Sequence, residues 1–467
     1  MRTLGNVRPT PEQLAIVSSN RPGIEVIRGA AGSGKTTTAL LRLRSLIGMF
    51  VSRKARLRAN EPVRILILTY NRTLRGYIDT LARQQVAEAD EIDLQIFTFA
   101  SWAVNGIGHI NKVEDHIRDQ KLLELGSSTH LNRDFLLEEI EYVMGRFLPE
   151  SLNDYLTVRR DGRGISPRVE RPLREVILND VIRPYQSWLH DQNLCDWSDL
   201  AVHLASNKLD KQYDIIIADE TQDFSANQIR AIKNQLAEIH SVTFVVDTAQ
   251  RIYARGFTWQ EAGIPVRPEN SKRLSRNYRN TIEIARFAEP LIKGIPIDDD
   301  ATIPDFSKCT ESGPKPQVIK GKYSAQAEYV ISYIRNNIDL RTESAAILHP
   351  LGGGWFRYIK SAFDDAGLEY TEISRRTDWP EGDENIAFST LHSSKGLEFD
   401  HVIIIGLNAE VMRHGDEEGD DRLIMLRRLL AMGIGRAKKS VILGYKPDTA
   451  ASLIAYLDPD TYQAIDL

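Results

Sequence analysis

Residues 29–36 form a glycine-rich loop of the pattern G-x-x-x-x-G-K-[ST], and this motif constrains the fold more than any other feature of the chain. The pattern requires a buried strand before it and a helix after it, and the sequence supplies apolar Ile24–Ile27 and Leu- and Ala-rich Thr37–Ile47. Its glycines let backbone N–H groups point at phosphate oxygens, and the positive end of the following helix strengthens that field. Lys35 is then expected to reach the β- and γ-phosphates, and the Thr36 hydroxyl to bind Mg²⁺. We therefore predict that the chain binds a nucleoside triphosphate.

Length and composition indicate an ordinary globular protein. The 467 residues are enough for about two to four domains, and 42% hydrophobic with 26% charged residues is a typical balance. No apolar run approaches the ~20 residues of a membrane span, and the first residues lack the apolar core of a signal peptide. Cys195 and Cys309 stand far apart, which argues against a zinc site, an iron–sulfur cluster or a disulfide. We expect a cytoplasmic protein that does not bind membranes.

The net charge of −5 argues against a chain that is basic throughout and binds nucleic acid by charge alone. Charge is nevertheless unevenly distributed, because residues 42–60 hold six basic side chains and no acid. Such a run is more often a solvated surface than a binding site, and both interpretations stay open.

Short apolar strands alternate with helices in two stretches, which is typical of parallel α/β domains. The expected strands of the first stretch are Ile24–Ile27, Val63–Thr69, Leu94–Thr98, Tyr213–Ala218 and Val242–Val246. Those of the second are Pro316–Ile319, Ser344–Leu348, Asn385–Thr390, His401–Ile405 and Ser440–Leu443. Between the third and fourth strands of the first stretch, residues 102–196 have a mostly helical pattern, with helices expected over Asp134–Phe147 and Leu173–Trp188. This pattern predicts a subdomain inserted into the first domain.

Two acidic residues follow the expected strand Ile215–Ile217 in the run Asp219-Glu220-Thr221-Gln222-Asp223. Acids at the carboxyl end of a buried strand, in a chain with a phosphate loop, indicate metal binding and water activation. We expect Asp219 to hold Mg²⁺ and Glu220 to take a proton from the attacking water. A solvated acidic turn is the alternative, but it leaves the adjoining apolar strand unexplained.

With these motifs in place, the chain resembles the UvrD/Rep-like helicases of superfamily 1 over nearly its whole length. The most specific block is Ser389–Phe399, a near-complete match to the family pattern T-x-H-x-x-K-G-L-E-F. Further matching blocks are Pro11-Glu12-Gln13, Leu68–Asn71, Phe97–Phe99, Val246–Tyr253, Leu274–Arg279 and Arg427–Lys438. The resemblance implies an α/β fold of two RecA-like P-loop NTPase domains with parallel sheets, a helical insertion in the first, and ATP between them. The predicted bounds are 1–101 and 197–272 for the first domain, 102–196 for the insertion, and 273–467 for the second domain.

The resemblance also implies the residues of the ATP site. It gives γ-phosphate sensing to Gln250, arginine fingers to Arg279 and Arg436, adenine contacts to Gln13 and Tyr278, and a ribose contact to Glu398. The predicted ATP-binding residues are Gln13, Gly29, Ala30, Ala31, Gly32, Ser33, Gly34, Lys35, Thr36, Thr37, Tyr278, Arg279, Glu398 and Arg436. The predicted catalytic residues are Glu220, Lys35, Arg279, Arg436 and Gln250, and the predicted Mg²⁺ ligands are Thr36 and Asp219.

Contacts to single-stranded DNA are implied in the same way. The predicted DNA-binding residues are Thr69, Tyr70, Asn71, Thr98, Trp259, Thr390 and His392. Trp259 is included because Ala254-Arg255 stands where many family members have a base-stacking Trp, so that Trp259 or arginine stacking takes over.

The sequence departs from the family pattern at three further places. Gly435 stands where a Thr or Ser usually precedes the second finger, and Thr37 replaces a frequent Arg after the phosphate loop. Only residues 280–389 separate Arg279 from Thr390, which is about what a second RecA-like core needs by itself. We therefore expect the large insertion of the long helicases to be missing from the second domain, with Arg375–Glu384 as its truncated site.

The leading function is an ATP-driven translocase or helicase that moves 3′-to-5′ along single-stranded DNA. Because the large insertion is missing, we expect the isolated chain to unwind long duplexes poorly. The alternative is a nucleic-acid-gated ATPase that regulates a partner nuclease or other effector, as small UvrD-like proteins do in two-gene phage-defence systems such as Gabija, which this chain resembles in size. A phosphate-loop ATPase with no nucleic-acid role is the third class, and the match at Thr390–Phe399 argues against it.

Overall fold

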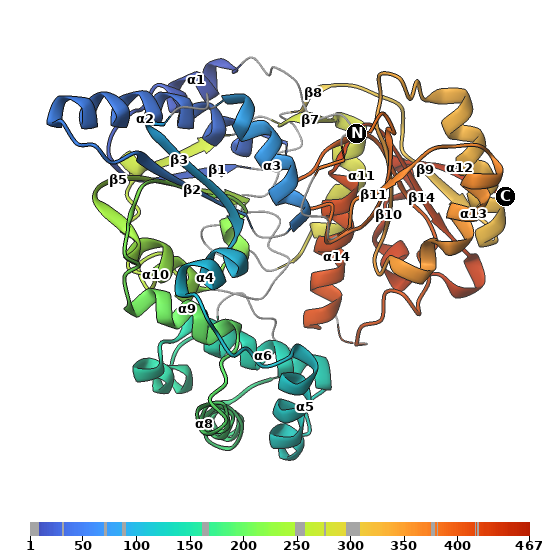
Figure 1. Ribbon diagram of the computed structural model, residues 1–467. Helices are drawn as coiled ribbons and strands as arrows, with labels where there is room; N and C mark the ends of the chain where they lie inside the picture. Colours follow the sequence, from blue (N-terminus) through green and yellow to red (C-terminus); the bar gives the residue numbers. More distant parts are fainter. Residues whose placement is uncertain are drawn as a thin grey trace.

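The computed structural model contains two α/β units, each built on a parallel sheet (Figure 1). We call them the first and second unit, in chain order. The structure describes residues 9–29, 32–69, 72–85, 90–160, 168–247, 257–274, 277–295, 309–374, 379–380, 382–415, 417 and 420–467.

The first unit has a six-stranded sheet whose neighbouring strands are all parallel. Its strands are β1 (Gly23–Gly29), β2 (Val63–Thr69), β3 (Ile92–Thr98), β4 (Tyr213–Ala218), β5 (Leu236–Asp247) and β6 (Ser271–Leu274), in the order β3-β2-β4-β5-β1-β6. Its helices are α1 (Pro11–Val17), α2 (Lys35–Leu57), α3 (Arg72–Gln85), α4 (Phe99–Ile107), α9 (Trp197–Ser206) and α10 (Ala226–Asn234). All six residues of β4 are buried, as expected of a central strand with helices on both faces.

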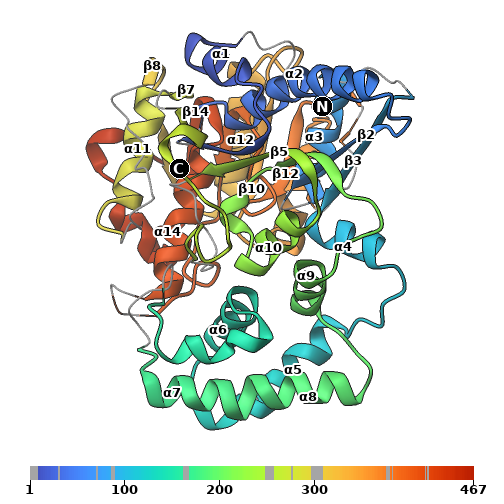
Figure 2. The same ribbon diagram turned by 90° about the vertical axis from the view of Figure 1, so that its left-hand side faces the viewer.

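A helical insertion connects β3 and β4 and has a hydrophobic core of its own, from Val113 to Leu189. Its helices are α5 (Asp115–Leu125), α6 (Arg133–Arg146), α7 (Arg171–Val176) and α8 (Arg183–Asp191), and a π-helical segment, Ile177–Ile182, joins the last two. Figure 2 shows these helices gathered at one end of the first unit. The two ends of the insertion lie side by side, because Lys112 and Cys195 form a parallel bridge.

The second unit has a seven-stranded sheet, again with parallel neighbours. Its strands are β9 (Gln317–Lys320), β10 (Ala345–His349), β11 (Thr371–Glu372), β12 (Ile386–Thr390), β13 (Phe399–Ile404), β14 (Ala437–Tyr445) and β15 (Gln463–Asp466), in the order β11-β12-β10-β13-β14-β9-β15. Its helices are α11 (Ile282–Ile292), α12 (Tyr323–Asn337), α13 (Arg357–Asp365) and α14 (Asp421–Ile434). A separate pair, β7 (Asn277–Thr281) and β8 (Cys309–Glu311), precedes this sheet in the chain.

The structure refines the predicted bounds in two places. Trp102, the expected first residue of the insertion, is buried in the core of the first unit, and the core of the insertion begins only at Val113. Strand β6 pairs with β1 and ends at Leu274, so the first sheet extends past the expected boundary between 272 and 273. Each of the ten expected strands overlaps a strand of the structure.

Helix α3 brings the two units into contact. The Thr73 hydroxyl donates a buried hydrogen bond of 2.8 Å to the carbonyl of Ile373 in the second unit. The Tyr77 ring packs edge-on against Trp379, with ring centroids 5.0 Å apart. Trp379 belongs to the segment between β11 and β12, where the truncated insertion was expected; residues 375–378 and 381 of that segment lie outside the described residues. The segment expected to replace a large domain therefore contacts the first unit.

Candidate nucleotide cleft and nucleic-acid edge

The phosphate loop connects β1 to α2. Gly32 and Gly34 have φ angles of +80° and +75°, a left-handed backbone that favours glycine. A Cβ at Gly34 would lie 2.4 Å from Gln13 Nε2, so a side chain at this position would also displace the Gln13 amide. Helix α2 begins at Lys35, and its first N–H groups therefore face the loop, as anion binding requires. Ala30 and Ala31 lie outside the described residues.

Thr36 and Asp219 meet at the base of this loop. The Thr36 hydroxyl donates to the Asp219 carboxylate, at 2.9 Å from Oδ2 and 3.1 Å from Oδ1. Burial and the neighbouring charge of Glu220 raise the pKa of Asp219 to about 7, and the hydrogen bond from Thr36 opposes this rise. One hydroxyl and one carboxylate suit Mg²⁺, which takes few protein oxygens and fills its shell with water and phosphates. Among the described residues, no cluster of three or more His, Cys, Asp or Glu could hold a metal alone.

Glu220 directly follows Asp219 and is held in an unusual conformation. Its φ is +53°, which is uncommon for a residue other than glycine. The Gln222 side-chain amide donates to Glu220 Oε2, and the Asp223 N–H donates to the Glu220 carbonyl at 3.0 Å. Lys395 of the second unit reaches the same carboxylate, with Nζ 3.5 Å from Oε2. The orientation of this carboxylate is therefore fixed by both units.

Two arginines of the second unit approach from the opposite side. Arg279 forms an ion pair with Glu398, and Lys438 lies 3.3 Å from the same carboxylate. Burial by itself would raise the pKa of Glu398, but the charges of Arg279 and Lys438 outweigh it and lower this pKa to about 2. The buried Arg436 donates to the carbonyls of Met432 and Leu397, at 3.2 and 3.3 Å.

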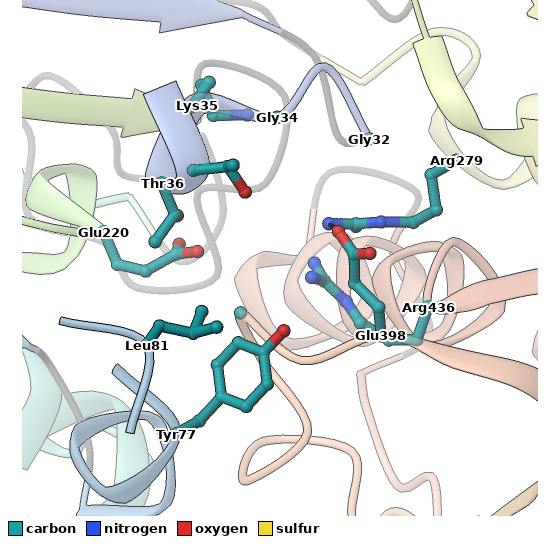
Figure 3. Close-up of a pocket in the computed structure, with 12 residues that line it drawn as sticks. Gly32, Gly34, Lys35, Thr36, Tyr77, Leu81, Glu220, Arg279, Glu398 and Arg436 are labelled. Atoms are coloured by element: carbon teal, nitrogen blue, oxygen red, sulfur yellow. Dashed lines mark hydrogen bonds and ion pairs between the residues drawn. The ribbon is translucent and has the colours of Figure 1, made fainter. Parts of the chain in front are cut away.

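These groups line one cleft between the units. Figure 3 shows Lys35, Thr36 and Glu220 on one side and Arg279, Glu398 and Arg436 on the other. The full set of lining residues is Gly32, Gly34, Lys35, Thr36, Thr37, Tyr77, Leu81, Glu220, Arg279, Gly396, Glu398 and Arg436. Tyr77 and Leu81 of α3 were not among the predicted site residues. The amphipathic pattern of residues 72–85 predicts that one face of this helix is buried. It does not predict which part of the protein that face packs against.

Other predicted nucleotide residues lie elsewhere or cannot be placed. Gln13 is buried against the phosphate loop, where its amide lies 3.4 Å from the Ser33 carbonyl and 3.5 Å from that of Gly34. Ser33 is itself fully buried. Gln250 lies outside the described residues, and Tyr278 lies in β7 with a side chain outside them.

Several predicted DNA contacts share the carboxyl ends of parallel strands. Thr69 ends β2 and Thr98 ends β3, and the two are partners across these neighbouring strands. Thr390 ends β12 in the second unit, and His392 follows in the next turn. Burial and the charges of Lys395 and Arg422 lower the pKa of His392 to about 4, so its imidazole is uncharged at neutral pH.

The other three predicted DNA contacts do not lie at described strand ends. Trp259 is half-buried and packs on Phe244 at 5.2 Å and on Phe257 at 6.3 Å, measured between ring centroids. Tyr70 and Asn71 lie outside the described residues. The role of all seven predicted residues toward DNA stays a prediction.

Comparison with known proteins decides the family. Residues 10–266 match the UvrD/REP helicase N-terminal domain, and residues 359–447 match the UvrD-like helicase C-terminal domain. The chain belongs to the UvrD/REP helicase family. Its two sheets accordingly correspond to two RecA-like domains. Its general activity is that of an ATP-dependent DNA helicase.

Individual UvrD/REP relatives are distant in sequence. A "Probable DNA helicase" of Mycoplasma pneumoniae is 23% identical over 97% of this chain and 85% of its own length. A "Probable DNA helicase II homolog" of the same organism is 25% identical over 60% of this chain and 41% of its own length. The "ATP-dependent DNA helicase Rep" of Buchnera aphidicola is 40% identical, but over 13% of this chain and 9% of its own length.

Membership of the UvrD/REP family implies that the chain uses ATP and binds DNA. Within the described parts of the chain, no helix is both long and apolar enough to cross a bilayer.

Proposed function

We propose that the chain is a motor that moves 3′-to-5′ along single-stranded DNA by closing and opening its two units around Mg²⁺–ATP. The observation that carries the proposal is the shared cleft, in which Lys35, Thr36 and Glu220 of one unit face Arg279 and Arg436 of the other. Groups that must meet across two units for hydrolysis make turnover depend on domain approach, and this dependence is how chemistry drives a conformational cycle.

The residues of the cleft have separate roles in this proposal. Lys35 and the loop amides bind the β- and γ-phosphates, and Thr36 with Asp219 holds Mg²⁺, which would neutralise developing phosphate charge. Glu220 accepts the proton of the attacking water. Arg279 and Arg436 stabilise the charge that develops on the γ-phosphate when the cleft closes.

The position of Arg436, the second proposed finger, is set by strand β7. The Asn280 side-chain amide in β7 donates to the carbonyls of Gly435 and Ala437, at 3.1 and 2.6 Å, one on each side of Arg436. Arg279 directly precedes Asn280, so the two proposed fingers are tied together in one short segment. This arrangement supports fingers that enter and leave the cleft as a unit.

We assign the first RecA-like domain to residues 1–111 and 196–274, the insertion to 112–195, and the second domain to 275–467. These bounds follow the pairing of β6 and the separate core of the insertion. Because only residues 373–385 separate β11 from β12, the second domain has no large inserted domain at this position. We therefore expect translocation on a bare strand but poor unwinding of long duplexes by the isolated chain.

The test uses DNA of 70 thymidines with biotin and streptavidin at either the 5′ or the 3′ end. Displacement from the 5′ end only, dependent on ATP and absent in Lys35→Ala, is the expected result. Displacement from the 3′ end only would show that the chain moves 5′-to-3′. Strong stimulation of ATP turnover by the strand without displacement from either end would favour the alternative, a DNA-gated ATPase that acts with a nuclease or other effector in the cytoplasm. Efficient unwinding of long duplexes by the purified chain would contradict the expectation of poor unwinding.

A further inference from the structure

A buried ion-pair cluster connects the two units directly beside Glu220. Lys395 of the second unit forms an ion pair with Asp223 of the first and also reaches Glu220, at 3.5 Å. Lys395 is 2% exposed and Asp223 is fully buried. Charges so removed from water depend on each other for stabilisation, and a displacement of one is opposed unless the others follow. A movement of Lys395 therefore changes the position of the Glu220 carboxylate.

Lys395 belongs to the turn that carries two of the proposed DNA contacts. The Ser393 N–H donates to the Thr390 hydroxyl at 3.0 Å, and the Ser394 N–H to the Thr390 carbonyl at 3.0 Å. The Lys395 N–H donates to the His392 carbonyl at 3.3 Å. Because these bonds join successive residues into one compact turn, a contact at Thr390 or His392 displaces Lys395 as well.

The Glu220 oxygen that Lys395 approaches already accepts a hydrogen bond. Glu220 Oε2 accepts from the Gln222 amide and lies 3.5 Å from Lys395 Nζ. The hydrogen bond from Gln222 and the positive charge of Lys395 together hold this oxygen in one orientation. A shift of the lysine away from Oε2 would free this oxygen, and a shift toward it would restrain the carboxylate further.

We propose that Lys395 is a positioning residue that transmits DNA contact at the Thr390–His392 turn to the Glu220 carboxylate. DNA on the second unit then sets the orientation of the group that accepts the proton from water on the first. The inference rests on the proposed function, because it requires that DNA stimulates hydrolysis. It adds a residue to that function which contacts neither nucleotide nor DNA.

The experiment measures ATP turnover with and without a saturating thymidine oligonucleotide, together with the Michaelis constant for ATP and the affinity for the oligonucleotide. Lys395→Met keeps the length of the side chain and removes its charge. We expect the stimulation ratio to fall by about fivefold or more, the scale of a coupling between sites, with little change in the Michaelis constant or in DNA affinity. Lys395→Arg, which restores the cation, should recover much of the ratio.

The controls separate coupling from general damage. Lys439→Met changes an exposed lysine of the same unit that pairs with Glu343, and it should leave the ratio unchanged. Asp223→Asn keeps the shape of the partner and removes its charge, so it tests the same cluster if Lys395→Met does not fold. An unchanged ratio in both cluster variants would overturn the inference. Equal loss of basal and stimulated turnover, or loss of oligonucleotide binding, would also overturn it, whereas absence of stimulation in the unmodified protein would instead overturn the proposed function.

Discussion

Thr36 and Asp219 are separated by 183 positions in the sequence, yet the hydroxyl of the first donates to both carboxylate oxygens of the second. The fold therefore brings the two predicted Mg²⁺ ligands, a hydroxyl and a carboxylate, within hydrogen-bond distance of each other. The raised pKa of Asp219, about 7, makes metal binding by this pair sensitive to pH.

The first prediction concerns this pH dependence. A proton on Asp219 competes with Mg²⁺, so the Mg²⁺ concentration for half-maximal turnover should fall as pH rises from about 6 to about 8. Thr36→Val removes a hydrogen bond that lowers the pKa of Asp219, and should move this transition to higher pH; Thr36→Ser should not. Mg²⁺ titrations at several pH values provide the measurement. Protonation of ATP itself is common to all variants, so identical transitions in Thr36→Val and the unmodified protein would count against Asp219 as a ligand.

Loss of the general base should separate binding from turnover. Glu220→Gln keeps the size of the side chain but cannot accept the proton of water, so turnover should fall by about 10²- to 10⁴-fold. Binding of a fluorescent ATP analogue should persist. Glu238→Gln, an exposed position in β5, is the matched control. Normal hydrolysis by Glu220→Gln would show that another group is the base.

Each of the two proposed arginine fingers should be needed for chemistry. Arg279→Ala and Arg436→Ala should each reduce turnover by about 10³-fold or more, as removal of an arginine finger does. Lys35→Ala should weaken both nucleotide binding and turnover, because it removes the cation at the phosphates. Arg286→Ala, on the exposed face of α11, controls for loss of positive charge on the second unit. Near-normal single-turnover rates in either finger variant would exclude that arginine from the transition state.

His392 should act at the DNA edge as a neutral side chain. Its pKa of about 4 means that a change of pH from about 6 to about 8 leaves its charge unaltered. His392→Ala should lower DNA-stimulated turnover and leave basal turnover nearly intact, whereas the exposed His116→Ala should change neither. Steady-state assays over this pH range provide the test. A loss of stimulation in the unmodified protein that titrates near 6.5 and vanishes in His392→Ala would mean that the imidazole ionises there.

Tyr77 should contribute to stability through its ring and to the cleft through its hydroxyl. Tyr77→Ala removes a buried ring that packs against Trp379, and should lower the free energy of unfolding by about 3 kcal/mol or more. Tyr77→Phe keeps the ring and should cost less than about 1 kcal/mol. Urea unfolding measures both variants. Equal destabilisation by the two substitutions would assign the effect to the hydroxyl.

Much of the fold was predictable, because parallel strands buried on both faces have continuous apolar runs. Val63–Thr69 and Tyr213–Ala218 were predicted at the bounds that the structure gives. Strands β6 and β15 were missed because they lack such an apolar run. Ser271–Leu274 and Gln463–Asp466 are short strands at the edges of their sheets and are rich in polar residues. They are identified only by their pairing with a neighbouring strand.

The candidate site was predictable where a motif has its own chemistry and not where tertiary packing creates it. Lys35, Thr36, Asp219 and Glu220 carry recognisable chemistry in short local patterns. Tyr77 enters the cleft only because α3 lies against the second unit, and Lys395 meets Asp223 only because two distant turns face each other. No local pattern contains that information, since the partner is 172 residues away.

The bridge between Lys112 and Cys195 has a consequence for how such chains diversify. Because the helical insertion leaves and rejoins the parent sheet at neighbouring points, and has its own core, it behaves as a module. Exchange of the chain between these two positions would replace the insertion with another domain and leave the six strands of the first sheet in place. The part of the protein outside the nucleotide cleft can therefore change in evolution while the residues of the cleft stay the same.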